Sequence, residues 1–459
     1  MINSIYNKIW EYSPEINNPS AYLQLQRLTR QLINIYNNEG RLEENPFTPT
    51  TRRKLSLPRV ELEYLLKDQT CMVTGGLGCV GSCLVNKLLE LGVRQVVIVD
   101  KRHYTGITSI NRNKIVYIEA DIRDLSTLEA AFQAYQPAYV FHTAAQRNPG
   151  YAEHNIVETV STNVLGTLNV VKTCEKTPSV KQCVFSSTGK SSRYYTNEVY
   201  SATKKICEFI FDTYAKQSSV IYSMVRFTHI LENSLMDMEL RNLWNANFSS
   251  IHSPGKYVTA QNVVEAADLL LNSLIHSEKN KCNFLIVRNL EWPVESLEVA
   301  LFYIKQSERD IPVIFKGNPI GYSEKFFRGQ LNWANPEELN LLINVYENKS
   351  LSYNKAGDII ISRISSTEPE VLEQALYELQ KVEGELQTKE CLLIELKKLV
   401  RASLLHVDRE DTLNILKWGL QPEYLFSQGA TMADYGSTVP LLMDSLNNLN
   451  VSYCVASTF

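Results

Sequence analysis

Three side chains in the middle of the chain have the types and spacing needed to oxidise a secondary alcohol. Tyr200 and Lys204 are four residues apart and share one face of an expected helix. An ammonium beside a phenol favours the phenolate, so we predict that Lys204 lowers the pKa of Tyr200. The tyrosine then takes a proton from a substrate hydroxyl that Thr188 orients, while hydride passes to a nicotinamide.

A glycine-rich turn upstream provides a place for a dinucleotide. A β-branched run leads into Gly75-Gly76-Leu77-Gly78-Cys79-Val80-Gly81, and a helical segment follows. Side chains at the glycine positions would block the tight turn, the approach of a pyrophosphate and the packing of helix on strand. Backbone N–H groups and the helix dipole then hold the phosphates. The residues predicted to bind the cofactor here are Gly75, Gly78, Cys79, Val80 and Gly81.

An acidic residue ends the next predicted strand. Asp100 lies nineteen residues after Gly81, close to the separation of about 20 expected of a ribose-binding acid. Its carboxylate can accept hydrogen bonds from both ribose hydroxyls and would repel a 2′-phosphate, which predicts NAD. Lys101 and Arg102 follow directly and could neutralise a 2′-phosphate, so NADP stays open.

The ends of later strands carry further residues predicted to line the same cofactor. Asp121 and Ile122 follow the third strand, where they would contact adenine, and an ordinary strand-end aspartate is the rival interpretation. Ala144 and Ala145 follow the fourth strand, where a nicotinamide ribose would pass. Small residues there also serve close packing, and that alternative stays open.

The elements that position these residues alternate between strand and helix from about Leu66 to Val287. Short β-branched runs occupy 71–73, 96–99, 115–118, 139–142, 183–186 and 221–225, with helical segments at 82–91, 128–135, 163–174 and 202–215. This alternation implies βαβ units and a mostly parallel sheet covered on both faces. We predict an α/β fold, a doubly wound parallel sheet of the Rossmann type, with a small mixed C-terminal substrate lobe and helical extensions at both ends.

Four segments are predicted along the chain. They are a helical extension and linker at 1–65, an NAD(P)-binding domain at 66–290, a substrate-side lobe packed on it at 291–350, and a mainly helical extension at 351–459. In the last segment, Leu372, Leu379, Leu386, Leu393 and Val400 recur every seven residues. This repeat predicts one long helix that either forms a coiled-coil seam or lies on its own subunit.

Composition excludes several classes of protein. The 459 residues carry 46 Lys+Arg and 50 Asp+Glu, a net charge of −4, which argues against nucleic acid or an anionic membrane as partner. Nine scattered cysteines without metal-ligand spacing indicate reduced thiols and no metal site. The N-terminus lacks a signal pattern and no stretch is apolar for long enough to span a bilayer, so we predict a cytoplasmic protein.

As a set, the motifs resemble the extended branch of the short-chain dehydrogenases/reductases, and within it the polysaccharide-biosynthesis (CapD-like) family of nucleotide-sugar 4,6-dehydratases and epimerases. The stretches that carry the likeness are VTGGLGCVGS at 73–82, HTAA at 142–145, TNVLGT at 162–167, VRF at 225–227 and GYSEK at 321–325. They lie within residues 60–335. The resemblance implies Asn163, Tyr200 and Lys204 as further cofactor contacts, and Gln146, Arg226 and His229 as substrate contacts.

The resemblance also implies a chemistry, from which this chain departs at one position. Family members oxidise C4 of a UDP- or GDP-sugar with bound NAD(P), a lysine removes the C5 proton, and an adjacent aspartate helps to expel the C6 hydroxyl. Here the family's STDK stretch reads Ser187-Thr188-Gly189-Lys190, so the lysine is kept and the aspartate is missing. Dehydration is therefore in doubt. Lys190 acting as a base at C5 would give epimerisation, and the alternatives are that it binds a phosphate or hydroxyl or is a solvated loop lysine. Glu198, close to Tyr200 in sequence, is a candidate replacement acid.

Three functions follow from these observations. The first is an NAD(P)-dependent enzyme that forms a 4-keto intermediate on a nucleotide-activated sugar. The second keeps the fold and oxidises another secondary alcohol or polyol, and the third is a catalytically silent NAD(P)-binding scaffold or sensor. Intact Thr188, Tyr200 and Lys204 favour an enzyme over the third possibility. The expected partners are a small-molecule substrate and further copies of the same chain, as a homodimer or higher oligomer.

Overall fold

The chain folds into two compact units. The computed structural model describes residues 2–103, 112–233, 245–322, 324–331 and 340–456. One unit comprises 1–54, 228–265 and 290–319, and the other comprises 55–227, 266–289 and 320–459. The second unit contains the glycine-rich turn and the Tyr200 segment, and we call it the nucleotide-binding unit. Ser323, in the GYSEK stretch, lies outside the described residues.

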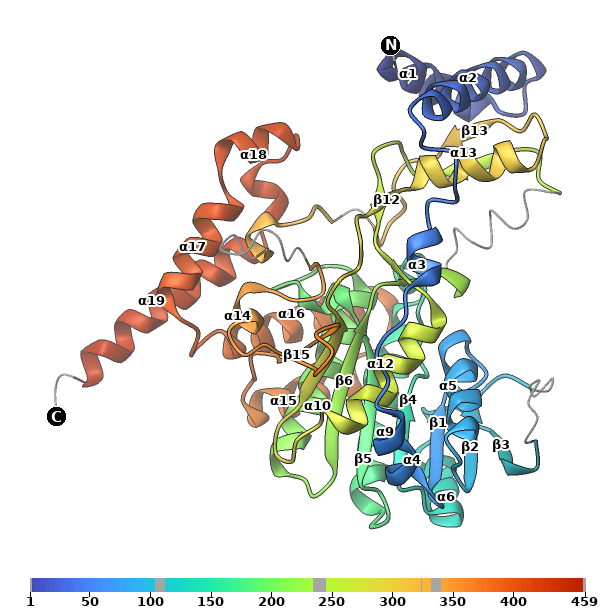
Figure 1. The fold of residues 1–459 in the computed structure, drawn as a ribbon. Helices are drawn as coiled ribbons and strands as arrows, with labels where there is room; N and C mark the ends of the chain where they lie inside the picture. The colour runs from blue at the N-terminus through green and yellow to red at the C-terminus, as the bar shows by residue number, and fades with distance from the viewer. Residues whose placement is uncertain (1, 104–111, 234–244, 323, 332–339, 457–459) are drawn as a thin grey trace. The chain divides into compact units, whose positions relative to one another are not determined.

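A nine-stranded sheet forms the centre of the nucleotide-binding unit (Figure 1). Its strands, in spatial order, are β14 (Ser352–Tyr353), β15 (Ile359–Arg363), β11 (Asn283–Val287), β6 (Ile221–Phe227), β5 (Gln182–Thr188), β4 (Tyr139–His142), β1 (Thr70–Thr74), β2 (Gln95–Asp100) and β3 (Ile115–Glu119). The seven strands from β11 to β3 are parallel, whereas β15 and β14 add to the edge in antiparallel pairs. Every residue of β1 is buried, as the apolar sequence of a doubly covered strand requires.

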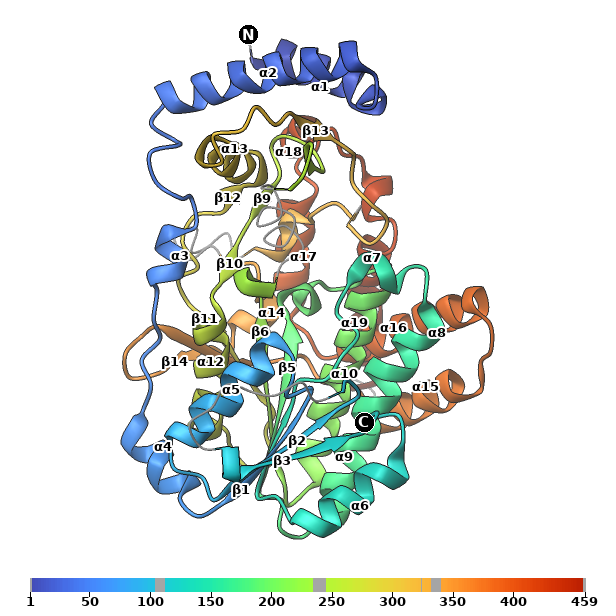
Figure 2. The same cartoon turned by 90° about the vertical axis from the view of Figure 1, so that its right-hand side faces the viewer.

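Helices cover both faces of this sheet (Figure 2). One face carries α4 (Arg59–Leu66), α5 (Cys79–Glu90) and α12 (Val263–Ile275), and the other carries α6 (Leu125–Tyr135), α9 (Gly166–Lys176) and α10 (Val199–Gln217). Shorter helices are α7 (Pro149–Ala152), α8 (Ile156–Val160) and α14 (Val345–Asn348), with a π-helical turn at Ser161–Leu165. A parallel sheet with helices on both faces confirms the predicted Rossmann-type fold. Because the sheet is parallel, the carboxyl ends of its strands meet at one edge, where ligands bind in such folds.

The C-terminal segment contains two helices where the sequence predicts one. The chain forms α15 (Pro369–Lys381) and α16 (Glu385–Ser403), separated by Gly384 at a φ of 85°, so the prediction of a single long helix is wrong. The residues of the apolar repeat that the structure buries include Leu372, Leu379 and Val400. Tyr195 hydroxyl donates to the Leu393 carbonyl at 3.3 Å, which ties α16 to its own unit. Three more helices follow, α17 (Arg409–Gly419), α18 (Pro422–Ser427) and α19 (Thr438–Ala456).

The other unit packs an N-terminal helical pair on a small mixed α/β element. Its helices are α1 (Ile2–Tyr12), α2 (Pro19–Asn38), α3 (Thr48–Arg52) and α13 (Ser296–Gln306), and its strands are β7 (His229–Ile230), β8 (Ser249–Ile251), β9 (Tyr257–Val258), β10 (Ala260–Gln261), β12 (Val294–Glu295) and β13 (Val313–Phe315). Apolar residues of α1, α2, α13 and β13 form one buried cluster. Arg41 NH2 lies 2.7 Å from Glu295 Oε2 and 2.5 Å from Glu298 Oε2, which joins the end of α2 to α13.

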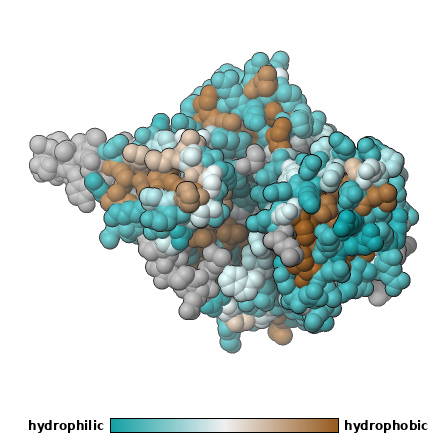
Figure 3. All heavy atoms as spheres, turned by 90° about the horizontal axis from the view of Figure 1, so that it is seen from above, coloured by the Kyte–Doolittle hydropathy of each residue, from teal (hydrophilic) through white to brown (hydrophobic). Residues whose placement is uncertain are grey.

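The surface mixes polar and apolar residues, with an apolar stretch along the C-terminal helices (Figure 3). Large apolar side chains exposed on these helices and their connections are Leu413, Phe426, Met432 and Met443. Among the described residues, no helix combines the length and the apolar character needed to cross a membrane. The homo-oligomer expected from the sequence stays a prediction.

Candidate active site

The glycine-rich turn joins β1 to α5 and can be made only from glycines at its key positions. Gly75 has a φ of 72°, and a Cβ built on it would lie 2.7 Å from the Ala144 backbone nitrogen. A Cβ on Gly81 would overlap the Gly75 carbonyl oxygen and come within 2.9 Å of Gly76 Cα. The helix then begins at Cys79 with Gly78 as its N-cap, and Cys79 and Val80 are half-buried. A bare helix N-terminus of this kind suits a pyrophosphate.

Asp100 lies at the end of β2, and its carboxylate faces the glycine-rich turn. Its Oδ2 accepts a hydrogen bond from the Leu77 N–H at 3.0 Å, and its Oδ1 accepts one from the Arg102 N–H at 3.0 Å. The Arg102 guanidinium also donates to both carboxylate oxygens at 3.3 Å, so the about four acceptor positions of a carboxylate are all used. Ribose hydroxyls would therefore have to replace the long bonds from the Arg102 side chain. Lys101 pairs with Glu158.

The two residues predicted beside adenine have different surroundings. Asp121 accepts from the Arg123 N–H at 2.9 Å and from its guanidinium at 2.7 Å. Burial alone would raise the pKa of Asp121, but its hydrogen bonds with Arg123 and the charge of that arginine lower it. Ile122 is buried and fills the space above Gly166, where a Cβ would lie 2.7 Å from Ile122 Cδ1. Asp121 is therefore held as a carboxylate, and Ile122 packs α9 against the end of β3.

The loop after β4 is fixed by an amide that the sequence assigns to the cofactor. Asn163 Oδ1 accepts from the Gln146 N–H at 2.8 Å, and Asn163 Nδ2 donates to the Gln146 carbonyl and to Thr203 Oγ1, each at 3.0 Å. The Gln146 side chain in turn bonds Asn148 within the same loop. Asn163 thus positions the loop that carries Ala144 and Ala145 relative to α10, and this use of its polar atoms was not visible in the sequence.

The predicted reacting groups converge at the end of β5. Thr188 is the last residue of β5, and Tyr200 is the second residue of α10. Burial raises the pKa of Tyr200 to about 12, and the nearby Thr188 side chain offsets part of that rise. Lys204 Nζ donates to the Ser186 carbonyl at 2.9 Å, and burial lowers the pKa of Lys204 to about 8. The pKa of Tyr200 is therefore raised rather than lowered in this structure, which contradicts the predicted net lowering.

Lys190 lies in a short helical turn, Gly189–Ser192, and is half-buried beside a carboxylate. Its Nζ is 3.0 Å from Glu198 Oε2 and donates to the Gly321 carbonyl at 3.3 Å. The same Nζ lies 4.7 Å from the centre of the Tyr322 ring. Burial lowers the pKa of Lys190, while the charge of Glu198 acts in the opposite direction. The interpretation of Lys190 as a solvated loop lysine is thus excluded.

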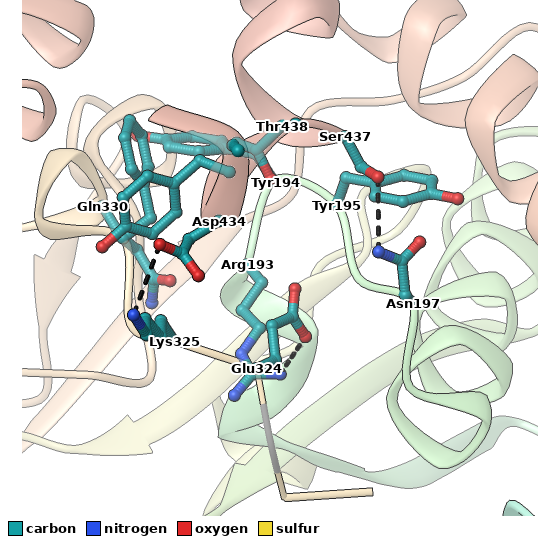
Figure 4. Close-up of a pocket in the computed structure, with 14 residues that line it drawn as sticks. Arg193, Tyr194, Tyr195, Asn197, Glu324, Lys325, Gln330, Asp434, Ser437 and Thr438 are labelled. Atoms are coloured by element: carbon teal, nitrogen blue, oxygen red, sulfur yellow. Dashed lines mark hydrogen bonds and ion pairs between the residues drawn. The ribbon is translucent and has the colours of Figure 1, made fainter. Parts of the chain in front are cut away.

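A pocket of about 110 Å³ adjoins this ion pair (Figure 4). Arg193 connects the two, because its NH1 lies 3.0 Å from Glu198 Oε2 and 2.5 Å from Glu324 Oε2. On the opposite side, Lys325 pairs with Asp434 at 3.3 Å. The aromatic lining residues are Tyr194, Tyr195, Phe327 and Tyr435. The C-terminal residues 433–438 form one wall, so the C-terminal extension contributes to a pocket beside the predicted reaction centre.

Arg226, predicted to contact substrate, is a structural residue. It is fully buried, and its guanidinium donates to both carboxylate oxygens of Glu208, to both of Glu347 and to the Leu342 carbonyl, at 2.7–2.9 Å. An arginine has five N–H donors, and all five of Arg226 are used within the protein. The prediction that Arg226 contacts the substrate is therefore wrong. His229 lies exposed in β7 of the other unit, and its role as a substrate contact stays a prediction.

Sequence analysis missed charged residues that the structure brings to the reaction centre. Arg147 is close enough for its charge to lower the pKa of both Tyr200 and Tyr322. Arg193 and Glu324 reach the same region from the loop before α10 and from the GYSEK stretch. No spacing rule identifies them, because they meet only after folding. Among the described residues, no group of three or more His, Cys, Asp or Glu side chains could hold a metal ion.

Comparisons with known proteins agree with this architecture. Residues 71–235 match the family model described as "Polysaccharide biosynthesis protein". The capsular polysaccharide biosynthesis protein CapD of Staphylococcus aureus is 24% identical over 312 residues, which cover 64% of this chain and 51% of CapD. The UDP-glucose 4-epimerase of Rickettsia rickettsii (strain Sheila Smith) is 23% identical over 259 residues, covering 54% of this chain and 74% of that enzyme.

Solved structures are similar at the level of the fold. The X-ray structure of Pen from Bacillus thuringiensis aligns with a TM-score of 0.55 at 19% identity, covering 65% of this chain and 90% of Pen. The chain spans about half the length of the first curated relatives that it matches. The predicted resemblance to the polysaccharide-biosynthesis family is confirmed, with a family match that covers residues 71–235.

Proposed function

We propose that this protein is an NAD(P)-dependent enzyme that oxidises a nucleotide-activated sugar to a 4-keto intermediate. The observation that carries the proposal is the convergence of Thr188, the last residue of β5, with Tyr200 and Lys204, which lie one helical turn apart at the start of α10. This pair stands at the carboxyl edge of the parallel sheet, the same edge as the glycine-rich turn, where a dinucleotide and a substrate can meet. The similarity to a UDP-glucose 4-epimerase supports the substrate class.

The residues around the turn fit a nicotinamide dinucleotide. The α5 N-terminus would hold the pyrophosphate, and Asp100 would accept hydrogen bonds from the adenosine ribose. The buried Asp100 carboxylate favours NAD, and the adjacent Arg102 keeps NADP as the alternative. When bound, the dinucleotide supplies the hydride acceptor.

The chain's own residues would move the proton that accompanies oxidation. Thr188 lies close enough to Tyr200 to affect its pKa, so a sugar hydroxyl bound between them would be oriented by one and deprotonated by the other. Lys204 is buried against the Ser186 carbonyl and would stabilise negative charge as it forms on Tyr200. Because the pKa of Tyr200 is about 12 in this structure, this oxidation should become faster as the pH rises through the neutral range.

The test is mass spectrometry of a panel of nucleotide sugars incubated with the protein and NAD or NADP. An isomer of unchanged mass indicates epimerisation, loss of one water indicates dehydration, and loss of two hydrogens with reduced cofactor indicates net oxidation. Tyr200→Phe should lower turnover at least about 100-fold, the smaller effect expected of losing a general base. Tyr214→Phe, on the same helix, is the matched control and should keep turnover. Cofactor binding with no change across the panel would refute the sugar-nucleotide proposal.

A further inference from the structure

Position 189 is closed to an acidic side chain by packing as well as by sequence. A Cβ built on Gly189 would lie 2.8 Å from Leu342 Cγ and 3.3 Å from Leu342 Cδ1. Leu342 itself is held in place, because its N–H donates to Asn340 Oδ1 at 3.0 Å and its carbonyl accepts from Arg226 at 2.9 Å. A proton donor for the sugar must therefore come from another side of the site.

Glu198 is a buried carboxylate with one oxygen unused. The residue is 5% exposed, and its Oε2 accepts from Lys190, Arg193 and Ser201 at 3.0, 3.0 and 3.2 Å. Its Oε1 is buried and has no hydrogen-bond partner among the described residues. A buried carboxylate oxygen without a partner is costly. Such an oxygen is suited to carry a proton or to meet a hydroxyl of a bound substrate.

The Lys190–Glu198 pair lies beside the redox centre. Glu198 is the N-cap residue of α10, two residues before Tyr200, and the Lys190 N–H donates to Thr188 Oγ1 at 3.4 Å. Tyr322 lies near both the Lys190–Glu198 pair and Tyr200. Lys190 Nζ lies over the Tyr322 ring, and Tyr322 interacts electrostatically with both Tyr200 and Glu198. A sugar oxidised at Tyr200 would thus present its neighbouring carbon near Lys190.

We propose that Lys190 and Glu198 act as a proton-transferring pair on the carbon next to the ketone, an inference that rests on the proposed function. The ammonium proton of Lys190 passes to Glu198 across their hydrogen bond, which leaves a neutral amine and a carboxylic acid. The amine takes the C–H proton, and the electron pair of that bond forms the enolate, which the adjacent ketone stabilises. Glu198 then returns its proton to the substrate, either to carbon or to a leaving hydroxyl that departs as water, and the original ion pair is restored.

The test is the exchange of this C–H proton with solvent, measured as deuterium gained by the sugar nucleotide in D₂O. The wild-type protein with NAD(P) should incorporate one deuterium beside the oxidised carbon. Glu198→Gln cannot carry the proton and should slow incorporation by about 100-fold or more, the range for losing a general acid or base. Lys190→Met should lose incorporation to a similar extent, which guards against a folding defect of one variant. Both variants should still oxidise the sugar, seen as absorbance of the reduced nicotinamide.

The matched control is Asp212→Asn, which removes a buried carboxylate on α10 that pairs with Lys216 rather than Lys190. This variant should keep deuterium incorporation within a few-fold of the wild-type protein. If Glu198→Gln exchanges as fast as Asp212→Asn, the pair does not transfer the proton and the inference is overturned. Oxidation without deuterium gain in the wild-type protein overturns the inference alone. Absence of oxidation with every nucleotide sugar overturns the proposed function as well.

Discussion

His142 should make the nucleotide-binding unit sensitive to acid. The side chain is fully buried in β4, with Nδ1 2.8 Å from Thr74 Oγ1 and Nε2 2.8 Å from Thr167 Oγ1. Burial, with a smaller effect from the charge of Lys204, lowers the pKa of His142 to about 3. An unfolded histidine titrates near 6.5, so between about pH 6.5 and pH 3 the unfolded chain binds one proton more. Stability from this residue is therefore present above pH 6.5 and is lost as the pH falls towards 3.

The size of the effect follows from the two pKa values. Acidification from about pH 7.5 to about pH 5 should cost about 2 kcal/mol through His142 alone, since each unit below 6.5 adds about 1.4 kcal/mol. His142→Asn does not titrate, so its opening free energy should fall about 2 kcal/mol less over the same interval. Its stability at neutral pH should be lower, because one of the two threonine hydrogen bonds is lost.

Hydrogen exchange of peptides from β1 and β4, corrected for the intrinsic effect of pH, measures this local opening free energy. His406→Asn is the control, because the side chain of His406 is 84% exposed. The control should retain the full acid dependence of the wild-type protein. If His142→Asn loses as much opening free energy as the wild-type protein, then His142 is not held neutral and the reasoning fails.

Two further predictions concern the cofactor site and the buried arginine. Asp100→Asn should weaken NAD binding by about 10- to 100-fold, because hydrogen bonds to a charged group contribute about 1.5–3 kcal/mol. NADP binding should be weakened less, and fluorescence titration with both cofactors measures the two losses. Equal losses would contradict the assignment of Asp100 to the ribose. Arg226→Met should lower the free energy of unfolding in urea by about 3–5 kcal/mol, because it leaves Glu208 and Glu347 buried and uncompensated. A stable Arg226→Met variant with a raised KM would instead support a substrate contact.

The fold and the residues predicted to bind the cofactor could be read from the sequence because their signals are local. The glycines of the Gly75–Gly81 turn and the acid Asp100 occur at the fixed spacing that the strand–turn–helix backbone requires. The apolar runs of the parallel strands are equally local. The prediction of one helix from the regular repeat at 372–400 failed because the chain becomes extended at Val382, and Gly384, with a φ of 85°, is the N-cap of a second helix.

Roles that depend on burial could not be predicted. Arg226 sits in a motif shared with sugar-nucleotide enzymes, yet its carboxylate partners Glu208 and Glu347 are 18 and 121 residues away in sequence. Asn163 was assigned to the cofactor, but its amide bonds Gln146 and Thr203, which only the folded chain brings near. Such contacts are long-range, and no pattern in one sequence reports them.

The loss of the aspartate at position 189 is coupled to the packing beneath it. Because the Leu342 side chain fills that space, an aspartate could return only if that side chain moved. Gly189→Asp alone should therefore destabilise the unit rather than restore an acid. Under the proposed function, the proton for a keto sugar would come from Glu198 at the N-terminus of α10. The fate of the proposed intermediate would then depend on whether Glu198 returns its proton to carbon or to a leaving hydroxyl.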